Sequence, residues 1–165
     1  MITNKIEIAY KTCALSELTE ADRGLIEKAK EMTYRSYAPY SRFHVGAAIL
    51  MADGSVSTGS NQENAAFPSG ICAERNACWH ASSEKPGMAM KKIAIAARNA
   101  ATFPVDESGK APFQSSPISP CGACRQSLLE YEKLYGPIEV LLFGEKETYI
   151  FPSVASLLPF CFTEF

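Results

Sequence analysis

The chain has 165 residues, the size of a single domain, and a formal net charge of −2. It is 47% hydrophobic and 21% charged, which is the balance of an ordinary globular protein. It contains no apolar run of about eighteen residues and no run of about five Lys and Arg, which argues against a membrane span and against a nucleic-acid-binding segment.

We expect a cytoplasmic protein, because the first residues lack the uninterrupted apolar region and the small-residue cleavage site of a secretory signal. In a reducing compartment, the six cysteines are more typical of metal binding or catalysis than of disulfides.

The first part of the chain predicts an arm and a helix. Residues 1–15 are expected to form a short strand or an arm, since apolar residues alternate loosely there: Ile6, Ile8 and Tyr10. Residues 19–37 repeat apolar side chains at helical spacing, and Thr19 and Asp22 have the spacing of a capping box.

A β-hairpin is predicted next. Phe43–Met51 and residues 55–60 have the character of strands, and Asp53-Gly54 between them is a strong signal for a tight turn. Both faces of the first strand are largely apolar, so we expect helices or partners to cover both sides of the sheet.

The second half of the chain alternates helices and strands. In chain order we expect a helix at 72–83, a strand at 93–97, a helix at 121–134, a strand at 138–143, and a further strand with a helical turn within 148–158. This alternation predicts an α/β fold: a three-layer α/β/α sandwich with a central mixed five-stranded sheet, in a single domain of residues 1–165.

Residues 99–119 form a long segment with three prolines and no periodicity. A loop of this length inside a compact domain is uncommon and is often functional or mobile. Because it leads directly to Cys121, it could line a site there, and a plain surface excursion is an equally good interpretation.

Two short cysteine segments carry the chemistry. The first is Cys72-Ala73-Glu74-Arg75, and the second is Pro120-Cys121-Gly122-Ala123-Cys124. Structural zinc is normally closed by four protein ligands, whereas catalytic zinc keeps three ligands and one open position. The sulfurs of Cys121 and Cys124 fall on one face at the start of a helix, whose positive end favours thiolates, as it does for Cys72. We therefore predict a catalytic Zn²⁺ bound by Cys72, Cys121 and Cys124.

The two residues beside Cys72 complete this prediction. Glu74 is poorly placed to bind the same ion and is expected to move protons as a general acid and base. Three thiolates leave a Zn²⁺ site with a net charge of −1, and Arg75 can reduce that charge by donating hydrogen bonds to the sulfurs. Zinc deaminases that act on nucleobases use this combination of thiolates and a glutamate that does not bind the metal.

Other interpretations of the cysteines are open. A CxxC pair alone is also typical of a thiol-redox motif or of a structural zinc site in a binding or assembly module. The Cys-Ala-Glu segment upstream favours catalysis. The remaining cysteines are expected to be inert: Cys13, Cys78 and Cys161.

Several ordered motifs, spread over residues 25–162, support a resemblance to a known family. They are Tyr37-Ala38-Pro39-Tyr40-Ser41-Arg42-Phe43, Val45-Gly46-Ala47-Ala48, Asn61-Gln62-Glu63-Asn64-Ala65-Ala66, the two cysteine segments with Arg125-Gln126, and Leu157-Leu158-Pro159. In this order they resemble the cytidine deaminases of pyrimidine salvage, specifically the homotetrameric type with three cysteine ligands.

The resemblance implies substrate contacts beyond the metal. Phe43 matches an aromatic that packs on the pyrimidine ring, and Asn61 and Glu63 match a pair that hydrogen-bonds the ribose 3′-hydroxyl. Ala73 matches a position whose backbone faces the base, and Phe162 matches an aromatic that reaches a neighbouring subunit's site.

The resemblance also implies the reaction: hydrolytic deamination of cytidine and 2′-deoxycytidine to uridine and 2′-deoxyuridine plus ammonia, with one Zn²⁺ per subunit of a homotetramer. The expected partner is a small pyrimidine nucleoside, with neither nucleic acid nor a membrane involved. A related deaminase acting on a nucleoside antibiotic or on a base in a polymer is the nearest alternative. The chain departs from the family's pattern at Phe67, where many members have tyrosine, in its extra N-terminal residues, and in the longer segment before Ser119.

Overall fold

A mixed sheet of six strands forms the centre of the computed structural model, which describes residues 1–102, 104–107, 109 and 111–163. Across the sheet the order is β1-β6-β5-β4-β2-β3, and only the β4–β5 pair is parallel. The strands are β1 (Lys11–Cys13), β2 (Phe43–Met51), β3 (Val56–Ser60), β4 (Met90–Asn99), β5 (Glu139–Phe143) and β6 (Thr148–Phe151).

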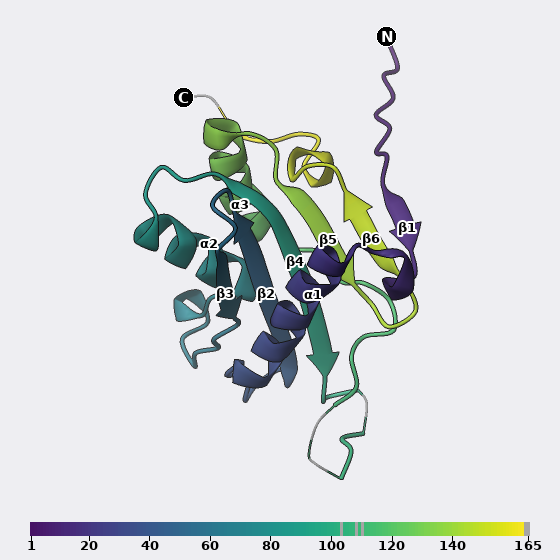
Figure 1. The fold of residues 1–165 in the computed structure, drawn as a ribbon, viewed down its shortest axis with the longest axis vertical. Helices are drawn as coiled ribbons and strands as arrows, with labels where there is room; N and C mark the ends of the chain where they lie inside the picture. Colours follow the sequence, from purple (N-terminus) through teal and green to yellow (C-terminus); the bar gives the residue numbers. More distant parts are fainter. Residues whose placement is uncertain (103, 108, 110, 164–165) are drawn as a thin grey trace.

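Helices cover both faces of this sheet (Figure 1). Helix α1 (Glu20–Met32) packs on one face, and α2 (Ala73–Glu84) and α3 (Gly122–Tyr135) pack on the other. The sequence prediction of a three-layer α/β/α sandwich is therefore confirmed. None of the helices in the described part of the chain has the length and apolarity needed to cross a bilayer.

The prediction of five strands is wrong by one. The additional strand is β1, which pairs antiparallel with β6 at the edge of the sheet, Lys11 lying opposite Ile150. The alternating apolar residues of the first segment lie just before this strand, in an extended arm of residues 1–10. The sequence allowed a short strand or an arm within residues 1–15, and both are present, but the pairing of β1 with β6 joins residues about 140 positions apart and so has no local signal.

Helix α1 ends earlier than predicted, at Met32, and a 3₁₀ turn of Thr33–Arg35 follows it. At this point the buried guanidinium of Arg98, on β4, donates to Thr33 Oγ1 over 2.8 Å and to the Thr33 carbonyl over 3.0 Å. The start of α1 agrees with its prediction, because the Thr19 hydroxyl accepts a hydrogen bond from the Asp22 N–H over 3.1 Å.

Glycines allow two helices to approach the sheet closely. A Cβ on Gly46 of β2 would lie 2.0 Å from the Ala29 carbonyl oxygen of α1. A Cβ on Gly59 of β3 would lie 2.6 Å from the Ala73 carbonyl oxygen and 2.4 Å from the Ala77 nitrogen. The first turns of α2 therefore rest directly on the backbone of β3, and this contact fixes the position of the first cysteine segment.

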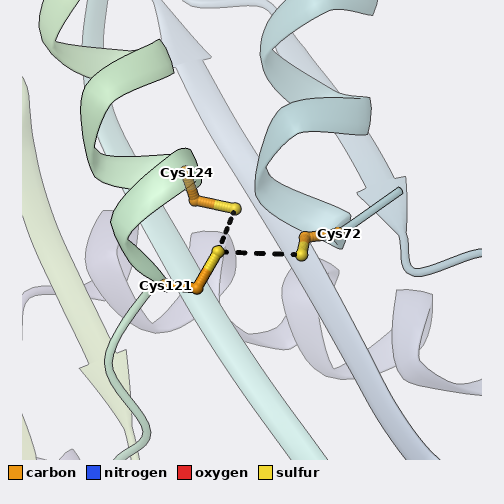
Figure 2. Close-up of side chains that lie close together, drawn as sticks. All are labelled: Cys72, Cys121 and Cys124. Atoms are coloured by element: carbon orange, nitrogen blue, oxygen red, sulfur yellow. Dashed lines mark hydrogen bonds between the residues drawn. The ribbon is translucent and has the colours of Figure 1, made fainter. Parts of the chain in front are cut away.

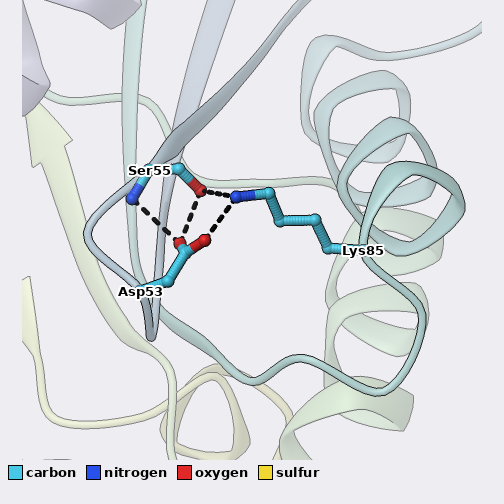
Figure 3. Close-up of polar contacts among 3 residues, drawn as sticks. All are labelled: Asp53, Ser55 and Lys85. Atoms are coloured by element: carbon cyan, nitrogen blue, oxygen red, sulfur yellow. Dashed lines mark hydrogen bonds and ion pairs between the residues drawn. The ribbon is translucent and has the colours of Figure 1, made fainter.

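The hairpin turn is tied to the far end of α2 (Figure 3). Asp53 Oδ1 accepts the Ser55 N–H over 3.0 Å, while Lys85 donates to the Asp53 carboxylate and, over 2.7 Å, to Ser55 Oγ. Hydrogen bonds from Lys85 and Ser55 hold the pKa of Asp53 well below its usual value. Both ends of α2 are thus fixed against the β2–β3 hairpin.

Candidate functional site

The two cysteine segments meet where α2 and α3 begin. Cys72 is the N-cap residue of α2, and Cys121 is the N-cap residue of α3, with Cys124 in the first turn of that helix. Neither capping side chain accepts a backbone N–H of its own helix, so both sulfurs can face each other across the gap between the helices. Figure 2 shows the three side chains converging from the two helix ends.

The spacing of the three sulfurs fits a single metal ion. Cys121 Sγ lies 3.9 Å from Cys72 Sγ and 3.4 Å from Cys124 Sγ, and all three sulfurs lie within 4.8 Å of one another. Tetrahedral Zn²⁺ with Zn–S bonds of about 2.3 Å places its sulfurs about 3.8 Å apart. Among the described residues no His, Asp or Glu joins this group as a fourth ligand, so one coordination position is left for water or substrate.

Cys72 and Cys124 have shifted pKa values. Hydrogen bonds from Cys124 and Arg75 lower the pKa of Cys72 to about 5. The hydrogen bond that Cys124 makes to Cys72, together with burial, raises the pKa of Cys124. The protein alone therefore favours the thiolate of Cys72 over that of Cys124, and a divalent cation would favour the thiolate form of its cysteine ligands.

Arg75 is the cation that the chain itself supplies to these sulfurs. Its Nη2 donates to Cys72 Sγ over 3.9 Å, and its guanidinium lies 5.6 Å from the centre of the Trp79 ring. Burial acts to lower the pKa of Arg75, but its contacts with Cys72 and Cys124 outweigh burial and raise it. That Arg75 reduces the negative charge of a three-thiolate site stays a prediction.

Glu74 is buried beside the sulfurs, with only 4% of its surface exposed. Burial first, and then the charge of Cys72, raise the pKa of Glu74 to about 7, although a hydrogen bond from Cys124 acts in the opposite direction. A carboxyl group with this pKa can both accept and donate a proton near neutral pH, as a general acid and base must.

A cleft of about 540 Å³ opens onto Cys72 and Arg75. It is lined by residues 40–41, 61–64, 67, 70–72 and 75, and its volume lies in the range of small-molecule sites. Asn61 and Glu63 both contribute to the lining, as the sequence prediction requires, and the ring of Phe67 is exposed at the cleft. None of the described residues of 99–119 lines this cleft.

Most of the hydrogen-bonding capacity of the Asn61 side chain is used by groups of the protein itself. Its Oδ1 accepts hydrogen bonds from Ser36 Oγ over 2.6 Å and from the Val45 N–H over 2.8 Å. Its Nδ2 donates to the Phe43 carbonyl oxygen over 2.9 Å, which leaves one N–H of the amide for a ligand.

Glu63 joins two parts of the cleft lining. Its Oε2 accepts the backbone N–H groups of Tyr40 over 2.9 Å and of Ser41 over 3.2 Å. Burial opposes the charged form, but hydrogen bonds from Ser41 and from the Tyr40 N–H outweigh burial and lower the pKa of Glu63. A carboxylate has about four acceptor sites on its two oxygens, so Glu63 can still accept a hydrogen bond from a ligand hydroxyl.

Three residues that the resemblance associates with the substrate do not line the cleft of the single chain. Phe43 is half-buried against the hydrophobic core, and Ala73 is fully buried under the first turn of α2. Phe162 is 67% exposed, and its backbone N–H and carbonyl are held by the side-chain amide of Gln126 at 3.4 and 2.6 Å.

Arg125 contributes to the site through the backbone before Cys121. It donates to the carbonyl oxygens of Pro120 and Leu157, each over 2.7 Å, and to Ser119 Oγ over 2.9 Å. The sequence did not predict these partners. The one feature of the sequence that pointed to Arg125 was its position directly after the CxxC pair, in the first turn of a helix.

The family model of the cytidine and deoxycytidylate deaminase zinc-binding region matches residues 19–135, a span that includes all three clustered cysteines and Glu74. The chain belongs to this family. Zinc is accordingly the metal that its three-cysteine group is suited to bind.

Individual relatives agree with this assignment. A cytidine deaminase of Sporosarcina psychrophila is 37% identical over 140 residues, which cover 85% of this chain and 90% of that protein. One from Halalkalibacterium halodurans is 42% identical over 108 residues, or 64% of this chain and 68% of that protein. The crystal structure of cytidine deaminase from Burkholderia pseudomallei matches with a TM-score of 0.67 and 37% identity, covering 88% of this chain and 100% of that one.

Proposed function

We propose that the protein catalyses the zinc-dependent hydrolytic deamination of cytidine and 2′-deoxycytidine to uridine and 2′-deoxyuridine, releasing ammonia, as a step of pyrimidine salvage. The observation that carries the proposal is the cluster of Cys72, Cys121 and Cys124 beside the buried carboxyl of Glu74, at one end of a cleft of nucleoside size.

In the proposed mechanism Cys72, Cys121 and Cys124 hold the ion as thiolates. When bound, zinc lowers the pKa of a water molecule so that it becomes a nucleophile near neutral pH. Glu74 accepts a proton from that water and delivers one to N3 of the cytosine ring. As the water oxygen bonds to C4, Glu74 is left as a carboxylate, so it would next take the remaining proton of the new C4 hydroxyl and give it to the amino group. The C4–N bond then breaks to release ammonia, C4 becomes a carbonyl, and the pKa of about 7 of Glu74 suits both directions of transfer.

Asn61 and Glu63 are the proposed ribose contacts. The remaining N–H of Asn61 donates to the 3′-hydroxyl oxygen, and the carboxylate of Glu63 accepts a hydrogen bond from the 3′-hydroxyl. These contacts do not involve the 2′ position, so ribose and deoxyribose are both accepted. A free base leaves both protein groups unpaired and is penalised for that reason.

The charges of the cleft favour a nucleoside over a phosphorylated substrate. Its charged lining residues are Glu63 and Arg75, and the contacts of Arg75 are with Cys72 and Cys124. A substrate phosphate would therefore lie near the Glu63 carboxylate, and the described lining of the cleft offers no cation besides Arg75 to neutralise it.

The proposal includes a cytoplasmic homotetramer with one Zn²⁺ per subunit. Large side chains that are exposed on the single chain support the assembly, among them Trp79, Phe160 and Phe162. Phe162 would then reach the site of a neighbouring subunit, and residues 1–165 would act as one catalytic domain.

The substrate proposal is tested by following ultraviolet absorbance during turnover of cytidine, 2′-deoxycytidine, cytidine 5′-monophosphate and a cytosine-containing oligonucleotide, with zinc content measured on the same samples. We expect the two nucleosides to have kcat/KM values within about tenfold of each other and at least about a hundredfold above those of the phosphorylated substrates. Preferred turnover of the oligonucleotide would contradict the proposal, as would a strong preference for ribose.

A further inference from the structure

Residues 1–10 form an extended arm that leaves the body of the protein just before β1. Figure 1 shows the arm running away from the sheet, and every residue of the arm is exposed. Its apolar side chains are large: Ile2 is 86% exposed, Ile6 51% and Ile8 46%. No strand in the described part of the chain pairs with the arm, so it offers unpaired backbone groups and apolar surface together.

The two sides of the arm differ in chemistry. Successive side chains of an extended chain point in opposite directions, so the even-numbered residues share one side, which is apolar except at Asn4: Ile2, Asn4, Ile6, Ile8 and Tyr10. Lys5 and Glu7 lie together on the other side, where Lys5 Nζ is 2.5 Å from Glu7 Oε1. An extended segment with one apolar side and one charged side is suited to pair with another strand that has the same pattern.

Tyr10, where the arm joins β1, is held by contacts with β6. Strand β6 cannot continue the β1–β6 ladder along the arm. Tyr10 stacks on Phe151 with ring centres 5.1 Å apart and lies edge-on to Tyr149 at 5.2 Å. In the β1–β6 register, Ala9 falls opposite Pro152, which has no N–H to contribute to a ladder. The arm therefore starts from a defined anchor and requires a partner from outside its own sheet.

We propose that the arm pairs with the same arm of a second copy of this chain, as two antiparallel strands centred on Ile6. In this register Lys5 lies opposite Glu7 of the partner subunit, and Glu7 lies opposite Lys5 of the partner subunit. Ile2 lies opposite Tyr10 of the partner subunit, and the two apolar sides face the same way. The contact is isologous, as a two-fold axis through Ile6 requires.

The charges of Lys5 and Glu7 favour this register over registers centred on a neighbouring residue. Moving the centre by one residue, to Lys5 or to Glu7, places that residue opposite its own copy, and like charges directly opposite each other are destabilising. If the two-fold axis instead passes between two neighbouring residues, even-numbered residues lie opposite odd-numbered ones. The apolar side of one arm then faces the same way as the charged side of the other. A parallel pairing in register also aligns Lys5 with Lys5 and Glu7 with Glu7.

Two paired strands alone are only marginally stable in water, so the arms form a weak contact. Such a contact gains strength when other surfaces already hold the copies together, because the second contact is then intramolecular. The inference concerns assembly and does not depend on the proposed reaction, since no arm residue lines the cleft.

A charge exchange tests the pairing without disturbing the folded core. Lys5→Glu places two acidic pairs across the axis, Glu7→Lys places two basic pairs there, and the double variant restores opposite charges. By sedimentation velocity over a concentration series, we expect each single variant to weaken self-association about tenfold or more at low salt, and the double variant to recover it. An equimolar mixture of the two single variants should associate more tightly than either variant alone.

A cysteine placed on the axis tests the register. Under mild oxidation, Ile6→Cys should form disulfide-linked dimers at least about fivefold faster than Thr3→Cys, because residue 6 alone lies opposite its own copy. Cytidine turnover of all variants should equal that of the wild type, which separates this inference from the proposed function. Equal self-association of all four charge forms would overturn the inference, and so would equal cross-linking at residues 3 and 6.

Discussion

The side-chain amide of Asn61 donates to the carbonyl oxygen of Phe43 over 2.9 Å, and this bond joins the cleft wall to the start of β2. The same side chain accepts the N–H of Val45, two residues further along the strand, over 2.8 Å. Asn61 therefore bridges backbone groups on β2 while it lines the cleft, so its effects on stability and on substrate binding must be measured together.

Asn61→Ala removes these bonds and leaves buried backbone groups without partners. We expect the free energy of unfolding to fall by about 2–4 kcal/mol, and the KM for cytidine to rise by at least about tenfold. Asn64→Ala is the matched control, because Asn64 also lines the cleft but is exposed and caps only the Ala66 N–H. Urea unfolding and steady-state kinetics of both variants make the comparison, and equal behaviour would contradict the role of Asn61.

Replacing Arg75 tests whether it reduces the charge of the thiolates. Arg75→Gln removes the cation beside Cys72, and we expect the affinity for zinc to fall by about 10- to 100-fold in competition with a chelator. Trp79→Leu serves as the control, since it removes the ring beside the guanidinium but keeps the donor to sulfur. Unchanged zinc affinity in Arg75→Gln would show that the arginine only fills space.

Two glycine-to-alanine substitutions should change the stability of the protein in opposite directions, because only one of them lies at the contact between α2 and β3. Gly59→Ala forces a methyl group against the backbone of Ala73 and Ala77, and should cost about 1–3 kcal/mol while weakening zinc binding. Gly24→Ala, in α1 with nothing within 4 Å of the added carbon, should stabilise the protein by about 0.5–1 kcal/mol. Thermal unfolding of both variants tests this, and a neutral Gly59→Ala would mean that α2 can move without cost.

Glu63 predicts a stability difference that depends on pH. Its folded-state pKa lies below the ordinary value of 4.5, so its ionised form adds stability above about pH 4.5. That stability is lost as the pH falls through the lowered folded-state pKa. The difference in unfolding free energy between wild type and Glu63→Gln should therefore be constant near neutral pH and shrink below pH 4.5. Urea titrations at several pH values measure it, and a difference that grows on acidification would contradict this assignment.

The sequence predicted those elements whose signals are local. Cys72 and Cys121 stand at the starts of their helices as expected, and the Asp53-Gly54 turn lies between β2 and β3. Features that depend on distant residues were missed. Arg98, 65 residues away, donates hydrogen bonds to Thr33 where α1 ends, and the short strand allowed within residues 1–15 joins the sheet by pairing with β6. The internal bonds of Asn61 likewise join segments that no local pattern connects.

The most direct test of the proposed chemistry is the turnover of cytidine by Glu74→Gln, measured with the zinc content of the same folded sample. Glutamine keeps the size of the buried side chain but cannot accept or donate the proton that the mechanism requires. We predict one Zn²⁺ per chain, a normal unfolding transition, and a kcat at least about a thousandfold below that of the wild type. A fully zinc-loaded variant that retains more than about a tenth of the wild-type kcat would contradict the role of Glu74, because general acid–base catalysis contributes at least about a hundredfold.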